Sequence, residues 1–586
     1  MRTPRTAPPA GWPASIRDMT QRLFTFLAAL PVTAALVAPA ADACTSMLVT
    51  KGATTDGATL ITYAADSHEL YGELYYTPAR RHAAGAMRDI IEWDTGKFLG
   101  RIPEAPVTYS VVGNMNEHQL SISESTFTGR KELEAPTGII DYGSLIYIAL
   151  ERARTAREAI QVMTTLVAEH GYASTGETFS IADPKEAWIL EMIGKGEGKK
   201  GAVWVARRLP DGMISAHANQ SRIRQFPLAD AENAVYAPDV ISFAREKGWY
   251  TGADKDFSFA DTYHPLDFEG VRFSEARVWS IFRRAAPSLG LGDEYADGSN
   301  PAKRLPLWVK PDKKLSVQDT MALMRDHFEG TKLDMTKDVG AGPYQVPYRW
   351  RPMTWEVDGK KYVHERAIST QQTGFSFVAQ MRSFMPDPIG GVLWFGVDDT
   401  FTTVYTPMYA GIRQAPHNLA QGVANRGSFS WDSSFWVFNW VSNQAYSRWS
   451  DMIVDVQKEQ GALEGQFLAD QTDIEKSALE QYKRDPEQAR KYLTDYSSQQ
   501  SDAVHARWRK LGENLLVKYI DGNVRDESGK VTHPKYPEGW YRHIARDAGE
   551  RIEVREAPKA EPKPVQKPEP KPLPKAEHKP TVAPAP

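Results

Sequence analysis

Short apolar runs separated by turn residues occupy two parts of the chain, residues 44–220 and 345–410. Such runs, bounded by Gly, Pro, Asn or Asp, are typical of strands. The predicted strands are Cys44–Val49, Thr59–Tyr63, Val107–Val112, Gln119–Ser125, Thr178–Ala182, Ala187–Ile193, Ala202–Arg207, Met213–Asn219, Tyr362–Ser369, Phe375–Arg382, Gly391–Val397 and Thr403–Pro407. Short turns such as Asp56-Gly57 join several of them, which favours antiparallel pairing.

Helical patterns interrupt these strands and recur after residue 430. The predicted helices are Ser144–Ala153, a helix from the capping box Thr155-Ala-Arg-Glu158 to His170, Ser274–Arg284, a helix from Ser316 to Gly330, and several over residues 432–520. Within the last group, Asp485-Pro486 provides a cap and an N1 proline. Blocks of strand, helix, helix and strand predict an α+β layered sandwich with antiparallel sheets and a C-terminal helical region, rather than a doubly wound fold.

The first 43 residues have the pattern of an export signal. Leu23–Val37 is apolar but is interrupted by Pro31, so it is too short to span a membrane as a helix. The small-x-small triplet Ala41-Asp-Ala43 follows as a cleavage site. We therefore expect residues 1–43 to be removed and the mature chain to be periplasmic or secreted.

Composition narrows the classes of function. The formal net charge of −4 indicates neither a nucleic-acid-binding protein nor a polybasic membrane protein. No later apolar run is long enough for a transmembrane segment. A single cysteine excludes an internal disulfide, and the thirteen histidines form no ligand spacing, so we expect no metal and no cofactor. The oligomeric state is left open.

That single cysteine, Cys44, directly follows the predicted cleavage site. Cleavage after Ala43 would give it a free α-amine, whose reference pKa is about 7.7–8.0, beside its own thiol. The amine can then act as the base for a thiol nucleophile that attacks an amide carbonyl and forms an acyl-enzyme. Two other interpretations stay open: a buried structural thiol and a lipid attachment point. Ala41 and Asp42 fit a lipidation signal poorly.

Several short motifs from Cys44 onward carry a resemblance to a known family. They are Cys44-Thr-Ser-Met-Leu-Val49, Asp56-Gly57, Ala64-Ala-Asp-Ser-His68, Asn116-Glu-His118, Ser123-Glu-Ser-Thr126, Ser215-Ala-His-Ala-Asn-Gln220, Ala276-Arg-Val-Trp279 and Thr373-Gly-Phe-Ser376. In this order they resemble the C69 dipeptidases, cysteine N-terminal-nucleophile (Ntn) hydrolases related to penicillin V acylase and bile salt hydrolase. The resemblance covers about residues 44–410. It implies a four-layer αββα Ntn-hydrolase sandwich and hydrolysis of dipeptides or short peptides.

The resemblance also implies roles for individual residues. Asp66 would orient the N-terminal amine, the Thr126 backbone N–H and the Asn219 amide would form an oxyanion hole, and Arg277 would lower the pKa of the Cys44 thiol. From the residues alone, Asp66 and Asn219 are equally turn residues, and Arg277 an ordinary arginine on a helix surface. One departure stands out. Related proteins have an arginine shortly before the acidic position, where this chain has Tyr63 or Ala64.

The sequence therefore predicts an exported cysteine dipeptidase. Its predicted parts are a signal segment 1–43, a catalytic domain 44–425, a helical subdomain 426–522, an irregular segment 523–556 and a disordered Pro/Lys-rich tail 557–586. Two alternatives stay open. One is an acylase that cleaves a non-peptide amide, and the other is a lipid-anchored binding protein that uses Cys44 only for attachment.

Overall fold

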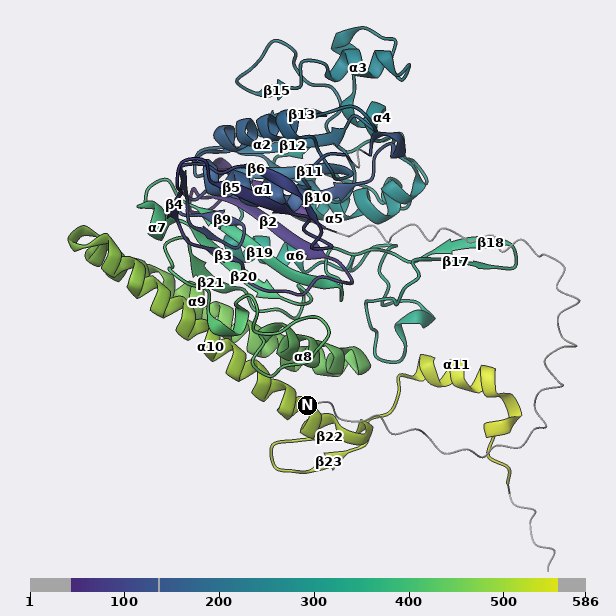
Figure 1. Cartoon of the computed structure of the whole chain (residues 1–586). Helices are drawn as coiled ribbons and strands as arrows, with labels where there is room; N and C mark the ends of the chain where they lie inside the picture. The colour runs from purple at the N-terminus through teal and green to yellow at the C-terminus, as the bar shows by residue number, and fades with distance from the viewer. Residues whose placement is uncertain (1–43, 135–136, 557–586) are drawn as a thin grey trace, which may run out of the picture. The chain divides into compact units, whose positions relative to one another are not determined.

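The computed structural model describes residues 44–134 and 137–556, so the predicted signal segment and the Pro/Lys-rich tail lie outside the described residues. The chain divides into two units at Lys518 and Tyr519, and each is described by itself. The first unit is an α+β structure with antiparallel sheets and a helical region at its C-terminal end, as the sequence predicts (Figure 1). Every helix of the described residues is too short or too polar to cross a membrane.

The first sheet contains the strand that directly follows Cys44. Among the described residues it has seven strands in the order β16-β14-β1-β2-β19-β20-β21. Their bounds are β16 Trp308–Val309, β14 Ile214–His217, β1 Ser46–Val49, β2 Thr59–Asp66, β19 Thr373–Met381, β20 Val392–Val397 and β21 Thr406–Tyr409. Every pair is antiparallel, and every residue of strands β14, β1, β2, β19, β20 and β21 is buried. Side chains on both faces of this sheet are therefore covered.

The second sheet is also antiparallel. Within residues 44–134 and 137–556 it has eight strands in the order β15-β13-β12-β11-β10-β9-β8-β3. Their bounds are β15 Ala234–Tyr236, β13 Ala202–Arg208, β12 Ala187–Gly194, β11 Gly176–Ala182, β10 Ser121–Phe127, β9 Met115–Asn116, β8 Val111–Val112 and β3 Tyr76–Thr77. Strands β1 and β2 of the first sheet pack against β10 and β11 of the second.

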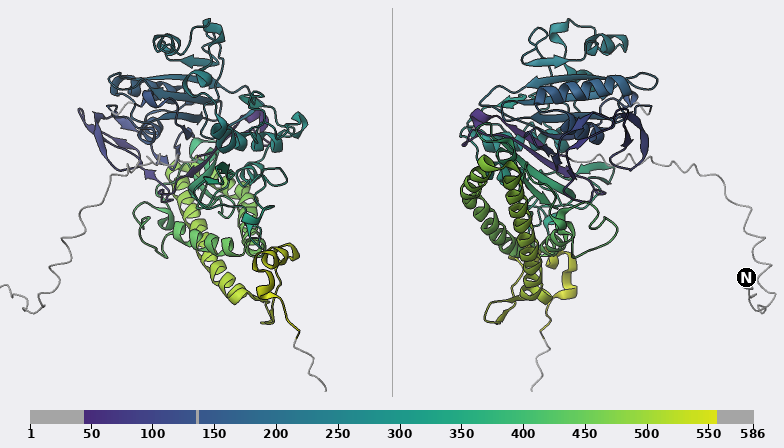
Figure 2. Two further views of the ribbon diagram at one scale, coloured as in Figure 1. Left: turned by 90° about the vertical axis from the view of Figure 1, so that its right-hand side faces the viewer. Right: turned by 60° about the vertical axis from the view of Figure 1, so that its left-hand side comes forward.

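Helices cover the outer face of each sheet, which gives the layers helix, sheet, sheet, helix (Figure 2). Helices α1 (Tyr142–Arg152) and α2 (Ala156–His170) pack on the second sheet. Helix α6 (Val317–Met324) packs on β2 and β19 of the first. Thr155 caps α2 by accepting a hydrogen bond from the backbone N–H of Glu158, which is one half of the predicted capping box. The Glu158 carboxylate accepts from the backbone N–H of Arg154 instead of Thr155.

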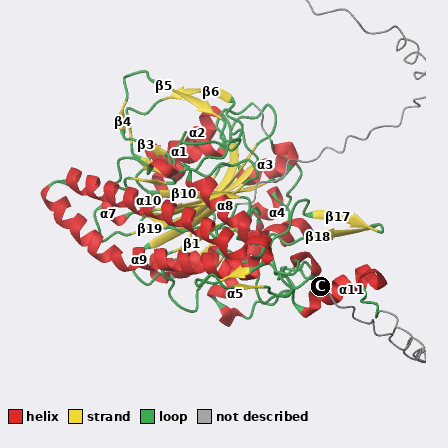
Figure 3. Ribbon diagram, turned by 90° about the horizontal axis from the view of Figure 1, so that it is seen from below, coloured by secondary structure: helices red, strands yellow, loops and turns green. Residues whose placement is uncertain are grey.

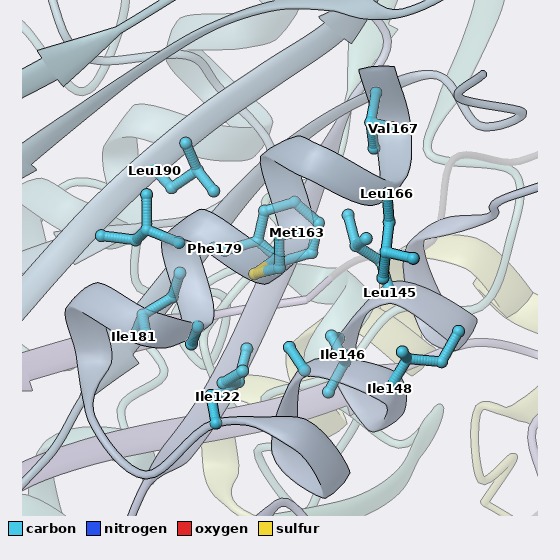
Figure 4. Close-up of a cluster of buried hydrophobic side chains, with 14 of the residues drawn as sticks. Ile122, Leu145, Ile146, Ile148, Met163, Leu166, Val167, Phe179, Ile181 and Leu190 are labelled. Atoms are coloured by element: carbon cyan, nitrogen blue, oxygen red, sulfur yellow. The ribbon is translucent and has the colours of Figure 1, made fainter. Parts of the chain in front are cut away.

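A hydrophobic core fills the space between α1, α2 and the second sheet (Figure 4). Its side chains come from both helices and from several strands, among them β10, β11, β12 and β13, and include Leu145, Ile148, Met163, Phe179, Ile181 and Leu190. Each large apolar side chain buried in this way contributes about 1.5–3 kcal/mol relative to exposure. This core holds β10 and β11 in place behind the inner layer where the candidate site lies.

The remaining elements of the first unit are short. They are β4 Arg80–Arg81, β5 Met87–Ile91, β6 Phe98–Pro103, β7 Val107–Thr108, α3 Val240–Glu246, α4 Phe259–Tyr263, a π-helical turn Gly270–Glu275, α5 Ala276–Ala285, β17 Thr354–Val357, β18 Lys360–Val363 and α7 Asp387–Gly390. Strands β4–β7, β5–β6 and β17–β18 form separate two-stranded ribbons. Helix α5 packs against β14, next to the strand that follows Cys44.

The helical region consists of α8 (Ser434–Ser447), α9 (Trp449–Arg484) and α10 (Pro486–Tyr519). Helices α9 and α10 are two long antiparallel rods that meet at Asp485, the predicted helix boundary (Figure 3). Ion pairs from Arg507 to Glu459 and from Lys518 to Asp455 join them along their length. The second unit contains, by itself, the ribbon β22 (Val524–Arg525) and β23 (Val531–Thr532) and helix α11 (Glu538–Ala548).

The strand predicted over Val107–Val112 is two short strands in different sheets, β7 and β8, and two further predicted elements are wrong in their extent. Helix α6 ends at Met324 instead of Gly330, because the chain turns so that Asp326 accepts a hydrogen bond from Ser280 and pairs with Arg284. The strand predicted over 362–369 ends at Val363, because β18 pairs only with β17. Local propensity marked both segments correctly as ordered, but tertiary contacts decided where each element ends.

Buried ion pairs attach α9 to the first sheet. Arg382, next to the end of β19, donates two hydrogen bonds to Glu475 of α9 at 2.6 and 2.8 Å, and both side chains are almost fully buried. Removing one partner of a buried pair leaves the other charge unpaired, which costs about 3–5 kcal/mol.

We therefore expect Glu475→Ala to lower the free energy of unfolding, measured by urea denaturation, by about 3 kcal/mol. The matched control is Asp495→Ala, which removes the partner of Lys491 in an exposed pair on α10. The control should change stability by no more than about 0.5 kcal/mol. Equal effects of the two variants would contradict a stabilising role of the Arg382–Glu475 pair.

Candidate active site

The structure brings four of the five predicted site residues together through strand pairing and through the packing of the two sheets. Cys44 directly precedes β1 and Asp66 ends β2. Because these strands are antiparallel neighbours, linked by paired hydrogen bonds between Thr45 and Ala64, the start of one lies beside the end of the other. Asn219 follows β14, the other neighbour of β1. Thr126 lies near the end of β10 in the facing sheet.

The fifth residue, Arg277 of α5, is fully buried and links several of these positions. Its guanidinium donates to the Cys44 carbonyl oxygen at 2.9 Å, to Thr45 Oγ1 at 2.8 Å and to Asn219 Oδ1 at 2.7 Å. It also donates to the carbonyl oxygens of Phe273 and Ala218. The side chain is thus buried beside the nucleophile candidate rather than on a helix surface.

One carboxylate oxygen of Asp66 accepts a hydrogen bond, and the other has no donor among the described residues. Thr373 Oγ1 donates to its Oδ1 at 2.6 Å, whereas no donor among the described residues reaches its buried Oδ2. Burial raises the pKa of Asp66 to about 8, although the Thr373 hydrogen bond and the charges of Arg277 and Arg366 act in the opposite direction. A further cationic donor at Oδ2 would favour the carboxylate form.

Arg366 is the closest match to the arginine that the sequence lacks near Tyr63. It belongs to the segment before β19, is buried, and acts electrostatically on both Asp66 and Cys44. Burial and the neighbouring charge of Arg277 lower the pKa of Arg366. Besides Arg277, a second positive charge near Asp66 therefore comes from a part of the chain about 300 residues away in sequence, which no local motif could reveal.

Asn219 connects the two sheets. Its backbone has φ 65°, the left-handed region that asparagine tolerates better than most residues. Its side-chain Nδ2 donates to the Thr126 carbonyl oxygen at 2.6 Å, and its backbone N–H donates to Ser125 Oγ. Thr126 Oγ1 in turn donates to Glu177 at 2.7 Å. The oxyanion-hole roles of Thr126 and Asn219 stay a prediction.

His217 supports this arrangement and was not singled out from the sequence. It is fully buried, and its ring nitrogens lie 2.6 Å from Ser125 Oγ and 2.7 Å from Ser180 Oγ. Because Ser125 Oγ accepts from the Asn219 N–H, its own proton points to Nδ1, which favours the neutral Nε2–H tautomer. Burial, together with the charges of Arg222 and Arg277, lowers the pKa of His217 to about 3.

Tyr63 and Glu124 were likewise not predicted to have roles. The Tyr63 hydroxyl donates to Glu124 Oε1, and its oxygen lies 3.5 Å from Cys44 Sγ. Because the tyrosine proton is directed at Glu124, the tyrosine oxygen is placed to accept a hydrogen bond from the thiol. Burial raises the pKa of Tyr63, so the phenol stays neutral. Glu124 was visible only as part of a short motif that carried the family resemblance.

Cys44, Asp66 and Thr126 line a cavity of about 560 Å³. Its other walls are largely acidic or aromatic, and include Tyr63, Glu69, Tyr71, Glu73, Tyr75, Trp93, Asp94, Glu124, Tyr142 and Tyr147. No lysine or arginine is among the described residues that line it. The same described residues contain no cluster of His, Cys, Asp and Glu side chains that could hold a metal ion. The cavity therefore offers a thiol, carboxylates and aromatic faces.

A buried thiol and a carboxyl that line one cavity, with a buried arginine bound to the backbone of the cysteine, suit a hydrolase. Comparison with known proteins identifies the class as a peptidase. Residues 76–461 match the profile of peptidase family C69, about two thirds of the chain. The protein belongs to peptidase family C69, which confirms the resemblance seen in the sequence.

Known relatives agree with this assignment at modest identity. A probable dipeptidase of Salmonella dublin is 27% identical over 401 residues, which are 63% of this chain and 82% of the relative. A probable dipeptidase of Latilactobacillus sakei is 26% identical over 378 residues, 61% of this chain and 71% of the relative. A probable dipeptidase B of Streptococcus pyogenes serotype M1 is 22% identical over 495 residues, 81% of this chain and 93% of the relative.

The environment of His217 predicts how stability changes in acid. The folded protein keeps this ring neutral down to about pH 3, whereas in the unfolded chain it takes up a proton near pH 6.5. Lowering the pH from 7 to 5 therefore favours the unfolded state, by about 2 kcal/mol from this residue. His217→Gln should lose about 2 kcal/mol less stability than the wild type over this interval.

The measurement is the free energy of unfolding from urea denaturation at pH 7 and at pH 5. His417→Gln, a change at an exposed histidine, is the control and should lose as much stability as the wild type. If His217→Gln also loses as much as the wild type, His217 is not held neutral in the folded protein.

Proposed function

We propose that this protein is an exported dipeptidase that matures by cleavage between Ala43 and Cys44 and uses Cys44 as its nucleophile. The observation that carries the proposal is the position of Cys44. Its thiol lines the cavity, its carbonyl is held by Arg277, and the available oxygen of Asp66 lies on the same wall. An α-amine created at residue 44 would supply the cationic donor that this carboxylate lacks.

The layers helix, sheet, sheet, helix support an Ntn-hydrolase fold, in which the nucleophile starts a central strand. Here Cys44 directly precedes β1, which has neighbours on both sides within its sheet. The names of the relatives support dipeptides as substrates. The cavity volume of about 560 Å³ lies within the range of small-ligand pockets, about 300–1,000 Å³.

The proposed reaction has two halves. In the first, the α-amine of Cys44 takes the thiol proton, and sulfur attacks the carbonyl carbon of the peptide bond. The tetrahedral oxyanion is stabilised by the Thr126 N–H and the Asn219 amide. The resulting ammonium then protonates the leaving nitrogen as the C–N bond breaks, which releases the second amino acid and leaves a thioester on Cys44.

In the second half, water replaces the leaving amine. The α-amine takes a proton from the water, whose oxygen attacks the thioester carbonyl. Collapse of this second tetrahedral intermediate breaks the C–S bond, returns the proton to sulfur and releases the first amino acid. Asp66 would hold the amine in place throughout, and Arg277 would fix the backbone that carries it.

The two alternatives, a lipid-anchored binding protein and an acylase, differ from this proposal in the role of Cys44 and in the substrate, respectively. A lipid anchor must reach the protein surface, but Cys44 is only 4% exposed and its thiol lines an acidic and aromatic cavity. An acylase for non-peptide amides would use the same nucleophile and differs only in substrate. Turnover of free dipeptides and of N-acyl amides by one preparation separates the two hydrolases.

The direct test compares the wild type with Cys44→Ala and Cys44→Ser in a screen of dipeptides, with released amino acids as the readout. Both variants should fold, as judged by circular dichroism, and should lose turnover by about 10,000-fold or more, as expected when a nucleophile is removed. Undiminished dipeptide turnover by Cys44→Ala would rule out Cys44 as the nucleophile.

Maturation is tested separately by the intact mass and N-terminal sequence of the exported protein. We expect Cys44 as the first residue, without any added mass. A diacylglycerol adduct on Cys44 would support the lipid anchor instead, and retention of Ala43 would leave no α-amine at Cys44 to act as the base.

Asp66→Asn tests how the amine is held. A carboxylate favours the ammonium form, so its removal should lower the pKa of the amine and move the acid limb of the kcat/KM profile to lower pH. The rate at the optimum should fall roughly 100-fold as the amine loses its position. Asp473→Asn, on the exposed side of α9, is the control. A wild-type pH profile in Asp66→Asn would remove Asp66 from the mechanism.

A further inference from the structure

The cavity contains a second carboxyl group that the proposed reaction does not use. Glu124 of β10 lines the cavity, is 1% exposed, and accepts a hydrogen bond from Tyr63 at its Oε1. Its buried Oε2 has no hydrogen-bond donor among the described residues. Behind it on β11 lies Glu177, which is 0% exposed and also has an Oε2 without a donor there. Glu124 is thus a buried carboxyl that has no cationic partner among the described residues.

Glu124 and Glu177 are close enough to interact directly through their carboxyl groups. Burial raises the pKa of both, and the charge of Glu124 raises that of Glu177 further, well above its ordinary value. Two buried carboxyls at this range hold one proton between them. With that proton on Glu177, Glu124 is the ionised member, and it is the one that faces the cavity.

The rest of the cavity also suits a cation. Asp66, Glu69, Glu73 and Asp94 line it, and no lysine or arginine among the described residues does. Three aromatic rings stand on the same wall: Trp93 stacks on Tyr147 at 4.8 Å between centroids, and Tyr75 meets Trp93 edge to face. Aromatic faces and carboxylates together favour a positively charged group. The compound that fills the cavity would therefore have to bring the positive charge.

The position of Glu124 relative to Cys44 indicates which positively charged group of a substrate would lie beside it. Glu124 interacts with the Cys44 side chain directly as well as through Tyr63, which contacts both, so the carboxylate lies beside the attacking sulfur. In a dipeptide, the α-nitrogen is two bonds from the carbonyl carbon that the sulfur attacks. A substrate in position for attack therefore carries its α-ammonium group close to the Cys44 thiol, within reach of a neighbouring carboxylate.

We infer that Glu124 is the receptor for the free α-ammonium group of the substrate, with Glu177 as its proton-bearing support, and that it selects unblocked dipeptides over N-acylated amides. This inference rests on the proposed function, because it takes Cys44 as the attacking group. It adds a specificity-determining residue to the site. A blocked amine brings no charge to the cavity and leaves the Glu124 carboxylate buried without a cation.

Binding to the inert Cys44→Ala protein tests this inference without turnover. Calorimetry would compare phenylalanyl-alanine, whose ring suits the aromatic wall, with its N-acetyl derivative. We expect the free dipeptide to bind roughly 30-fold more tightly, as for a hydrogen bond to a charged group. Adding Glu124→Gln should reduce this preference to about threefold or less. Adding Glu124→Asp, which keeps the charge, should preserve part of it.

Two matched variants complete the design. Glu177→Gln imitates the protonated carboxyl and should keep the preference for the free dipeptide, as should Glu69→Gln, a change at an exposed carboxylate of the same cavity. Equal binding of the two peptides to Cys44→Ala, failure of both to bind, or a preference that survives Glu124→Gln in a folded protein would overturn the inference. Undiminished turnover by Cys44→Ala would instead contradict the proposed function.

Discussion

The site depends on one buried cation, the guanidinium of Arg277. A guanidinium removed from water is costly unless every donor finds an acceptor and opposite charge lies near. Arg277 meets the first condition through carbonyl oxygens and the side chains of Thr45 and Asn219. Asp66 helps to meet the second. Burial lowers the pKa of Arg277 to about 10, so the side chain remains charged near neutral pH.

This constraint explains why residues from distant parts of the sequence have fixed positions at one end of the sheets. Arg277 holds the backbone at Cys44 and the side-chain oxygen of Asn219, and Asn219 in turn holds the Thr126 carbonyl of the facing sheet. His217 secures the same link from behind through Ser125. Rigid supports of this kind keep a nucleophile and its partners in reacting geometry without cost at the moment of reaction.

Much of the fold was predictable because local patterns are strong where strands are buried and turns are short. The strands next to Cys44, the capped helix at Thr155 and the helix boundary at Asp485 all follow from sequence spacing. The end of α6 and the strand predicted after Tyr362 were wrong, since contacts of Asp326 and the pairing of β18 decided them. These contacts join residues that no local window contains together.

The residues of the candidate site also fall into those that the sequence predicted and those that it did not. Cys44 stood out because it is the only cysteine and follows a cleavage pattern. Asp66, Thr126, Asn219 and Arg277 were found through a family resemblance, and the structure brings them to one place. Glu124, Glu177, His217 and Arg366 were missed as functional residues, because a buried glutamate, histidine or arginine has no signature along the chain. Only the pairing of β10 with β11 and the packing of the two sheets show what they contact.

The central claim is that Cys44 forms a covalent acyl-enzyme during peptide hydrolysis. Acid quenching of the wild-type protein during turnover of a dipeptide, followed by mass spectrometry of its N-terminal peptide, tests this most directly. The account predicts a thioester adduct on Cys44 whose mass equals that of the first amino acid of the substrate less one water. An adduct on any other residue during rapid turnover would contradict it.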